Sequence, residues 1–141
     1  MTIHIGADHA GFELKEKLVT HLKTLGHSVV DHGTHSAEST DYPDYAHPTA
    51  SAVLEDQTLG VLICGSANGV CMTANKHEGI RAALCWNVEV ASLARQHNNA
   101  NIICIPDRFV SEELAFQMTE TFLNTAFEGG RHQKRVEKIN C

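Results

Sequence analysis

The 141-residue sequence lacks the features that mark membrane, secreted and nucleic-acid-binding proteins. No apolar run approaches the roughly 20 residues with which an α-helix crosses a bilayer. The first six residues, MTIHIG, have neither the basic segment nor the long apolar stretch of a signal peptide, so we expect a cytoplasmic location. Aromatic residues make up only 6% and the net charge is −6, which argues against base stacking and phosphate-backbone binding. We therefore expect neither a membrane nor a nucleic acid among the partners.

Motifs for cross-links and cofactors are also missing. The five cysteines include no CxxC pair, and an odd number without a secretory signal argues against a disulfide framework. No Gly-Lys-Ser/Thr closes a glycine-rich loop and no GxGxxG occurs, so we expect no ATP or nicotinamide site. Ten histidines are present, but His32 and His35 have no third ligand at metal spacing. We expect no metal ion and no other cofactor.

What the sequence does contain is typical of a globular domain. Hydrophobic residues account for 43% and charged residues for 20%. A chain of this length buries roughly 68–70% of its unfolded surface. It shows no repeat, low-complexity segment or linker, so we expect one domain over residues 1–141.

Short apolar runs alternate with segments of helical periodicity. Five runs are expected as strands, at residues 2–6, 27–31, 59–64, 81–85 and 102–105. Helices are expected at 12–25, 45–55, 69–76 and 131–139. Two more are expected after capping residues, one from Asn87 to Gln96 and one that follows Ser111. Pro48 would be tolerated only in the first turn of its helix. The alternation predicts a Rossmann-like, three-layer α/β/α sandwich with a five-stranded, mostly parallel sheet, whose strand order the pattern does not reveal.

The segment from Cys64 to Gly69, CGSANG, is the most informative one. A loop of small residues between a buried strand and a helix exposes successive backbone N–H groups, which bind a phosphate or an enediolate. We expect the same donors to lower the pKa of the Cys64 thiol. The alternative is structural: Cys64 is the last core residue of a strand and the glycines form a turn.

Two histidine-containing segments are candidates for acid–base work. His97 and Asn98 lead into the fifth expected strand, and we expect them on the same side of the sheet as Cys64. Asp8 and His9 follow the first expected strand and could contact hydroxyls or phosphate. The structural alternatives are a helix-dipole partner for His97 and a helix cap for Asp8.

Basic residues could bind a phosphate. Arg131 and Arg135 are four positions apart and share one helical face, which in an acidic protein suits an anion site. Arg108, just after the fifth expected strand, fits the same role. The alternative is a solvated surface helix.

Together, six segments resemble the ribose-5-phosphate isomerase B family, which also includes galactose-6-phosphate and allose-6-phosphate isomerases. The resemblance covers nearly the whole chain. The segments are residues 6–12 (GADHAGF), 41–43 (DYP), 64–69 (CGSANG) with 74–76 (ANK), 79–82 (GIRA), 95–98 (RQHN) and 128–135 (EGGRHQKR).

The resemblance implies a cofactor-free aldose–ketose isomerase of the pentose phosphate pathway. Ribose 5-phosphate and ribulose 5-phosphate would interconvert through an enediolate, with Cys64 as the base and His97 as the acid that opens the sugar ring. Hydroxyls and phosphate would be bound by Asp8, His9, Asn98, Arg108, Arg131 and Arg135. The enediolate would be held by the loop of Gly65, Ser66, Ala67, Asn68 and Gly69. Family members are dimers or tetramers with sites at a subunit interface, so a homodimer or homotetramer with shared active sites is implied.

Two positions depart from the family pattern. Ala67 stands where the loop usually has glycine, which restricts the backbone. One branch of the family uses a glutamate at the position of Val70, and only the cysteine variant fits this chain. The alternatives are an isomerase of a six-carbon sugar phosphate and a catalytically silent sugar-phosphate-binding module.

Overall fold

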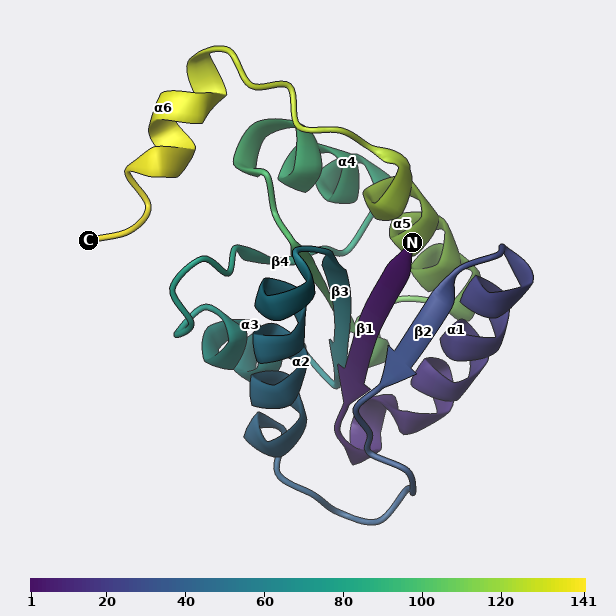
Figure 1. Ribbon diagram of the computed structural model, residues 1–141. Helices are drawn as coiled ribbons and strands as arrows, with labels where there is room; N and C mark the ends of the chain where they lie inside the picture. Colours follow the sequence, from purple (N-terminus) through teal and green to yellow (C-terminus); the bar gives the residue numbers. More distant parts are fainter.

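The computed structural model describes all residues, 1–141, and has a central sheet with helices on both faces (Figure 1). All four strand pairings are parallel and the strand order is β2-β1-β3-β5-β4. The strands are β1 (Thr2–Ala7), β2 (Ser28–Asp31), β3 (Leu59–Cys64), β4 (Ala82–Leu84) and β5 (Ile102–Pro106). The expected α/β/α sandwich is confirmed, and its sheet is wholly parallel.

Six helices connect and follow the strands. They are α1 (Phe12–Thr24), α2 (Pro43–Asp56), α3 (Asn68–Ala74), α4 (Val88–Asn98), α5 (Glu112–Asn124) and α6 (Arg131–Glu137). Two 3-10 turns, η1 (His9–Gly11) and η2 (Asp107–Phe109), follow β1 and β5. None of the helices is long and apolar enough to cross a membrane.

Alternating side chains of the strands feed two hydrophobic clusters. On one face, Ile3 and Ile5 of β1 pack with residues of α1, α4 and α5, and Phe122 is fully buried there. On the other face, Leu62 and Ile102 pack against α2 and α3. This period-2 division is what a sheet covered on both faces requires.

The predicted caps are confirmed, while some helix bounds differ. The Asn87 side chain accepts a hydrogen bond from the N–H of Val90 at 2.8 Å, and Ser111 accepts one from Leu114 at 3.1 Å. The helix expected from residue 45 begins at Pro43, so the expectation that Pro48 lies in the first turn was wrong. Pro48 is inside α2 but exposed, so water can hydrate the carbonyl that lacks its N–H partner.

Candidate active site

The carboxyl ends of β1 and β3 bring Asp8 and Cys64 together. The register pairs Ala7 with Ile63, so the next residue on each strand meets its neighbour across the edge of the sheet. The Cys64 thiol donates a hydrogen bond to Asp8 Oδ2 at 3.1 Å. A possible base and a carboxylate therefore form one unit where parallel sheets bind ligands.

Asp8 also caps the turn that follows it. Its Oδ1 accepts hydrogen bonds from the N–H groups of Ala10 at 3.0 Å and Gly11 at 3.3 Å. The side chain is 5% exposed. The structural interpretation of Asp8 as a cap is therefore correct, and its second oxygen is still available to Cys64.

The environment of Cys64 raises the pKa of its thiol to about 11. Burial contributes most, because it disfavours the charged thiolate. The hydrogen bond to Asp8 and the negative charge of Asp8 act in the same direction, while the N–H groups of Gly65 and Ala67 lower the pKa. The expectation of a lowered thiol pKa was therefore wrong. The loop donors act as predicted but are outweighed by burial and the carboxylate.

The loop after Cys64 has the tight conformation that its small residues suggest. Ala67 lies in the left-handed region at φ 63° and is fully buried. This explains why glycine usually stands at that place, since an L-residue there costs about 1–2 kcal/mol. A Cβ on Gly69 would lie 2.5 Å from the ring of Tyr42, so this ring covers the loop directly.

Arg108 brings a positive charge to the same loop. Its backbone N–H donates to the Gly65 carbonyl at 3.1 Å. Its guanidinium lies over Gly65, because a Cβ there would be 3.1 Å from Arg108 Cζ. The structure thus brings Asp8, Cys64, the loop and Arg108 together, as the sequence predicted.

His9 lies beside this group, in the turn after Asp8. Its Nδ1 accepts a hydrogen bond from the N–H of Thr40 at 3.1 Å. A neutral imidazole that accepts at Nδ1 carries its proton on Nε2. His9 is therefore oriented as a donor suited to a hydroxyl or phosphate oxygen.

His97 and Asn98 lie at the opposite edge of the sheet. Helix α4 runs back from the carboxyl end of β4, and Asn101, just beyond it, accepts a hydrogen bond from Gly60 at the start of β3. The expectation that His97 shares an edge with Cys64 was therefore wrong. A helix that leads into a parallel strand must end at the amino edge of the sheet. The order of strands and helices along the sequence therefore already indicated that His97 lies at this edge.

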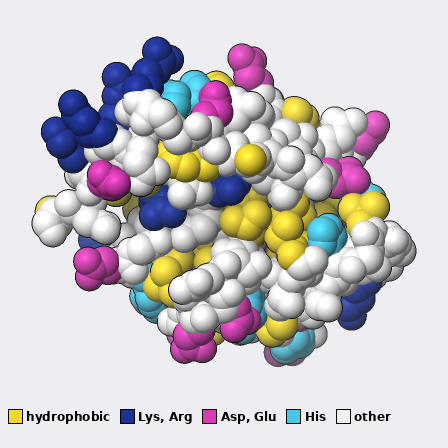
Figure 2. All heavy atoms as spheres, turned by 45° about the horizontal axis from the view of Figure 1, so that its top comes forward, with side chains coloured by type: hydrophobic (Ala, Val, Ile, Leu, Met, Phe, Trp, Pro, Cys, Tyr) yellow, Lys and Arg dark blue, Asp and Glu magenta, His cyan; other side chains and the backbone are white.

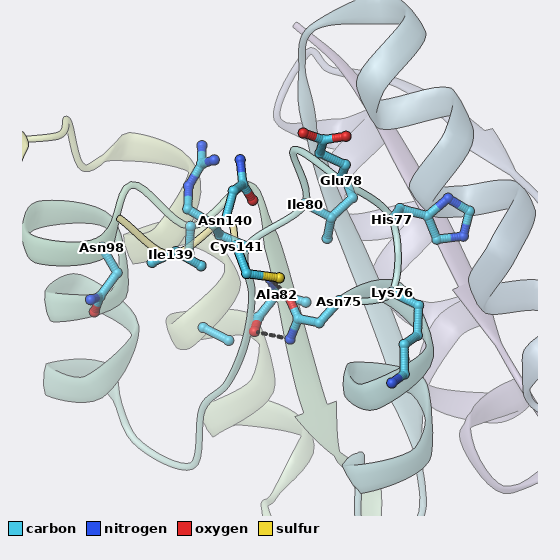
Figure 3. A pocket seen from close by; sticks show the side chains of 13 residues that line it. Asn75, Lys76, His77, Glu78, Ile80, Ala82, Asn98, Ile139, Asn140 and Cys141 are labelled. Carbon is cyan, nitrogen blue, oxygen red and sulfur yellow. Dashed lines mark hydrogen bonds between the residues drawn. The ribbon is translucent and has the colours of Figure 1, made fainter. Parts of the chain in front are cut away.

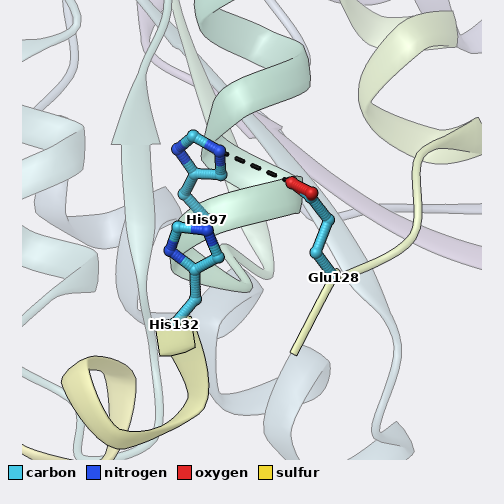
Figure 4. Close-up of side chains that lie close together, drawn as sticks. All are labelled: His97, Glu128 and His132. Atoms are coloured by element: carbon cyan, nitrogen blue, oxygen red, sulfur yellow. Dashed lines mark ion pairs between the residues drawn. The ribbon is translucent and has the colours of Figure 1, made fainter. Parts of the chain in front are cut away.

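His97 contacts residues of the C-terminal segment (Figure 4). Its Nε2 lies 3.5 Å from Glu128 Oε1, and its ring stacks on that of His132 with centroids 4.2 Å apart. Partial desolvation and the nearby charges of His97 and Arg131 lower the pKa of His132. Glu128 and His132 lie within a motif that the sequence singled out, but neither was assigned a role there.

Helix α6 carries Arg131 and Arg135 and projects from the rest of the chain near α4 (Figure 1). None of its residues is buried. Figure 2 shows Lys and Arg side chains gathered over this projecting helix. Within one chain, these two arginines therefore lie with His97 rather than with Cys64.

Two groups could hold a metal ion by distance alone. In the first, His97, Glu128 and His132, the stacked rings would have to turn before both pointed at one ion. The second comprises Glu16, Asp31 and His35, whose two carboxylates already bind the buried Lys15 ammonium. His32, the other imidazole considered as a ligand, pairs with His4 at 2.9 Å instead.

Two cavities of the chain, of about 630 and 650 Å³, are lined by neither Cys64 nor Asp8. The first lies beside the edge strand β4, between the segment after α3 and the last three residues (Figure 3). Asn98 lines this cavity. The candidate site at the carboxyl edge therefore lies outside both of these cavities.

Comparison with known proteins agrees with the fold and the motifs. The family model described as Ribose/Galactose Isomerase matches residues 3–139. The ribose-5-phosphate isomerase B of Escherichia coli K12 is 46% identical over 99% of this chain and 94% of its own length. A ribose 5-phosphate isomerase structure from Thermotoga maritima has a TM-score of 0.96 and 50% identity, covering 98% of this chain and 96% of that one.

A third relative was solved with a ligand. This is the ribose-5-phosphate isomerase B of Mycoplasma genitalium with bound ribulose-5-phosphate, which has a TM-score of 0.95 and 45% identity, covering 98% of this chain and 93% of that one. The family match spans nearly the whole sequence, and the relatives share the arrangement of strands and helices. The chain described here belongs to the ribose/galactose isomerase family.

Proposed function

We propose that this chain is a cofactor-free isomerase that interconverts ribose 5-phosphate and ribulose 5-phosphate. The observation that carries the proposal is the Cys64 thiol, seated at the head of a loop of backbone donors with Arg108 over it. Relatives named ribose-5-phosphate isomerase B support the substrate. The ribulose-5-phosphate bound to one relative supports it further.

In the proposed reaction, His97 first opens the furanose ring as a general acid. The Cys64 thiolate then takes the proton from C2, and the electrons of the C–H bond form an enediolate. Backbone N–H groups of residues 65–69 stabilise its oxygens, and one such donor contributes about 2.7–4 kcal/mol. The Cys64 thiol returns the proton to C1, while the proton of the C2 hydroxyl passes to the oxygen on C1 and leaves the C2 carbonyl of ribulose 5-phosphate. His9, Arg108, Arg131 and Arg135 bind the hydroxyls and phosphate, which holds the reacting carbons in place.

This reaction requires two copies of the chain, because the residues lie at opposite edges of the sheet. Cys64, Asp8 and Arg108 belong to one copy. His97, Asn98, Arg131 and Arg135 would come from a second copy, in a homodimer or a homotetramer built from such dimers. Each pair of chains would then contain two equivalent sites.

Two features of the single chain support such an assembly. A seven-residue helix without buried residues, α6, has little stability of its own and is expected to pack on another surface. Large apolar side chains are also exposed after the carboxyl ends of the strands, with Phe109 73%, Met72 65% and Trp86 55% exposed. Large apolar side chains that stay exposed in a single chain are typical of an interface.

The activity is tested by ¹H NMR of ribose 5-phosphate in D₂O with the purified protein and a chelator. Ribulose 5-phosphate should appear, and Cys64→Ala should abolish its formation while a phosphate ligand still stabilises the fold. Full activity of Cys64→Ala would refute its role as the base. The cytoplasmic location stays a prediction, testable by cell fractionation.

Two alternative functions can be distinguished with the same purified protein. A six-carbon sugar phosphate is the nearest alternative substrate. The shape of the site around Tyr42 and Ala67 decides which length of sugar fits. The six-carbon substrate would show a higher kcat/KM than ribose 5-phosphate. A catalytically silent sugar-phosphate-binding module would show ligand-induced stabilisation without any conversion.

A further inference from the structure

We propose that Asp8 is a substrate-operated switch: it keeps Cys64 protonated in the free enzyme and releases it when a sugar hydroxyl takes over its carboxylate oxygen. The proposal rests on the proposed role of Cys64 as the base. It assigns to Asp8 a control of the thiol in addition to contact with the substrate.

The geometry makes Asp8 a firmly held acceptor. One oxygen is fixed by two backbone N–H groups, of Ala10 and Gly11, and the other accepts the Cys64 thiol at 3.1 Å. The side chain is 5% exposed and takes part in no ion pair. Its second oxygen therefore has the thiol as its only protein partner, and a bound hydroxyl can replace that partner directly.

The free enzyme needs such a release before Cys64 can act. With a pKa of about 11, only about one thiol in 10⁴ is ionised at pH 7. Two of the three causes that raise this pKa come from Asp8. The two backbone donors that favour the thiolate, from Gly65 and Ala67, are already in place. Removing the Asp8 contact therefore leaves a site that favours the thiolate more.

Further charged groups of η2 and α1 lie near Asp8 or near its neighbour Asp107. Arg108 of η2 lies over the loop with its positive charge, while Asp107 of η2 lies near Asp8 and Glu13 of α1 lies near Asp107. Burial and these neighbouring carboxylates raise the pKa of Asp107. None of these side chains bonds to the Cys64 thiol, so Asp8 is the one group that can switch it by exchanging a hydrogen bond.

The proton balance of the cycle is simple. In the free enzyme, the S–H bond of Cys64 points to the Asp8 carboxylate. A substrate hydroxyl then donates to that oxygen, and the thiol releases its proton to water. The thiolate takes the C2 proton, forming S–H, and gives the same proton to C1, while the proton of the C2 hydroxyl passes to the oxygen on C1. When the product leaves, the thiolate regains a proton from water and its hydrogen bond to Asp8.

The test measures ionisation of Cys64 from thiolate absorbance near 240 nm, as the difference between each protein and its Cys64→Ser counterpart. In the wild type, the midpoint should be high, near 11. It should fall with saturating ribitol 5-phosphate, which has the hydroxyls and phosphate but no carbonyl. Inorganic phosphate alone should not lower it, since it offers no sugar hydroxyl.

Asp8→Asn is the informative variant, because Asn keeps the oxygen that caps the turn and loses the negative charge. Its midpoint should lie below that of the wild type and should not fall further with ribitol 5-phosphate. Alkylation of Cys64 by iodoacetamide at pH 8 should be about tenfold faster or more, since the rate follows the thiolate fraction. Glu13→Gln removes a nearby charge without touching Cys64 and should behave as the wild type.

An unchanged midpoint in Asp8→Asn would overturn the proposal. So would ribitol 5-phosphate that binds, as shown by calorimetry, without lowering the wild-type midpoint. Failure of the proposed function is a separate result, because it appears as wild-type protein that does not convert ribose 5-phosphate, and failure of Cys64 as the base appears as ribose 5-phosphate turnover by Cys64→Ser. The ionisation measurements use no turnover and therefore remain interpretable in that case.

Discussion

Mixing two inactive variants tests whether each active site is built from two chains. Helix α4 has 11 residues, so at 1.5 Å per residue its ends lie about 16 Å apart. His97 is at the end that faces the amino edge, while Cys64 is at the carboxyl edge. A helix length therefore separates the two edges, which is far beyond any hydrogen bond, and we predict that Cys64 and His97 of one chain do not serve one substrate.

The perturbation is Cys64→Ser in one chain and His97→Asn in the other. Each variant alone should lose about 10²- to 10⁴-fold in kcat, the usual contribution of a positioned acid or base. In a random mixture, half of the dimers pair one variant with the other. Each of these mixed dimers has one intact site and one doubly altered site, so about a quarter of the wild-type activity should return.

The assay uses two differently tagged variants, denatured together in urea, refolded and checked for mixed dimers by sequential affinity capture. Activity is followed as conversion of ribose 5-phosphate. The control refolds each variant alone, which should give no recovery. If mixed dimers form but activity stays at the level of the single variants, the shared site is refuted. The same conclusion would follow if His97→Asn alone kept full activity.

Three further predictions concern the scaffold of the site. Gly11→Ala should destabilise the protein by about 1–3 kcal/mol and reduce activity, because its Cβ would lie 2.8 Å from a backbone carbonyl oxygen of β3; urea unfolding would measure this. Lys15→Met should lower the free energy of unfolding by about 2–3 kcal/mol, because it leaves the carboxylate of Asp31, which is 23% exposed, without its cation. Lys17→Met breaks an exposed pair and should lower the free energy of unfolding by under about 1 kcal/mol. Equal effects of the two lysine changes would contradict the burial argument. Burial and a neighbouring imidazole lower the pKa of His32 below 6.5. The unfolded chain therefore binds more protons than the folded chain, and stability should fall as the pH drops below about 6.5. Urea unfolding at a series of pH values should show a smaller loss of stability in His32→Gln than in the wild type.

Much of the local structure was predictable because it depends on residues close together in the chain. Apolar periodicity located all five strands, and the caps at Asn87 and Ser111 follow from side chains that bond three residues ahead. The link between Cys64, Arg108 and Asp8 was also predictable, because the carboxyl ends of parallel strands meet at one edge.

The thiol pKa could not be predicted in the same way. Backbone donors of the loop are a local feature, and they act on Cys64 as expected. Burial and the carboxylate of Asp8, 56 residues earlier in the chain, act in the opposite direction and dominate. The sign of the shift is therefore a property of packing between distant segments.

The sequence by itself determined the fold class, the motifs of the family and the side chains available for chemistry, because periodicity, caps and small-residue loops are encoded locally. Only the tertiary structure decided the strand order, the contact of Asp8 with Cys64 and the separation of Cys64 from His97. The physical reason is that parallel strands joined by helices send successive chain segments to opposite edges of one sheet. Residues in one family pattern can thus lie a helix length apart in a single chain, which is why we propose that a second copy completes the site.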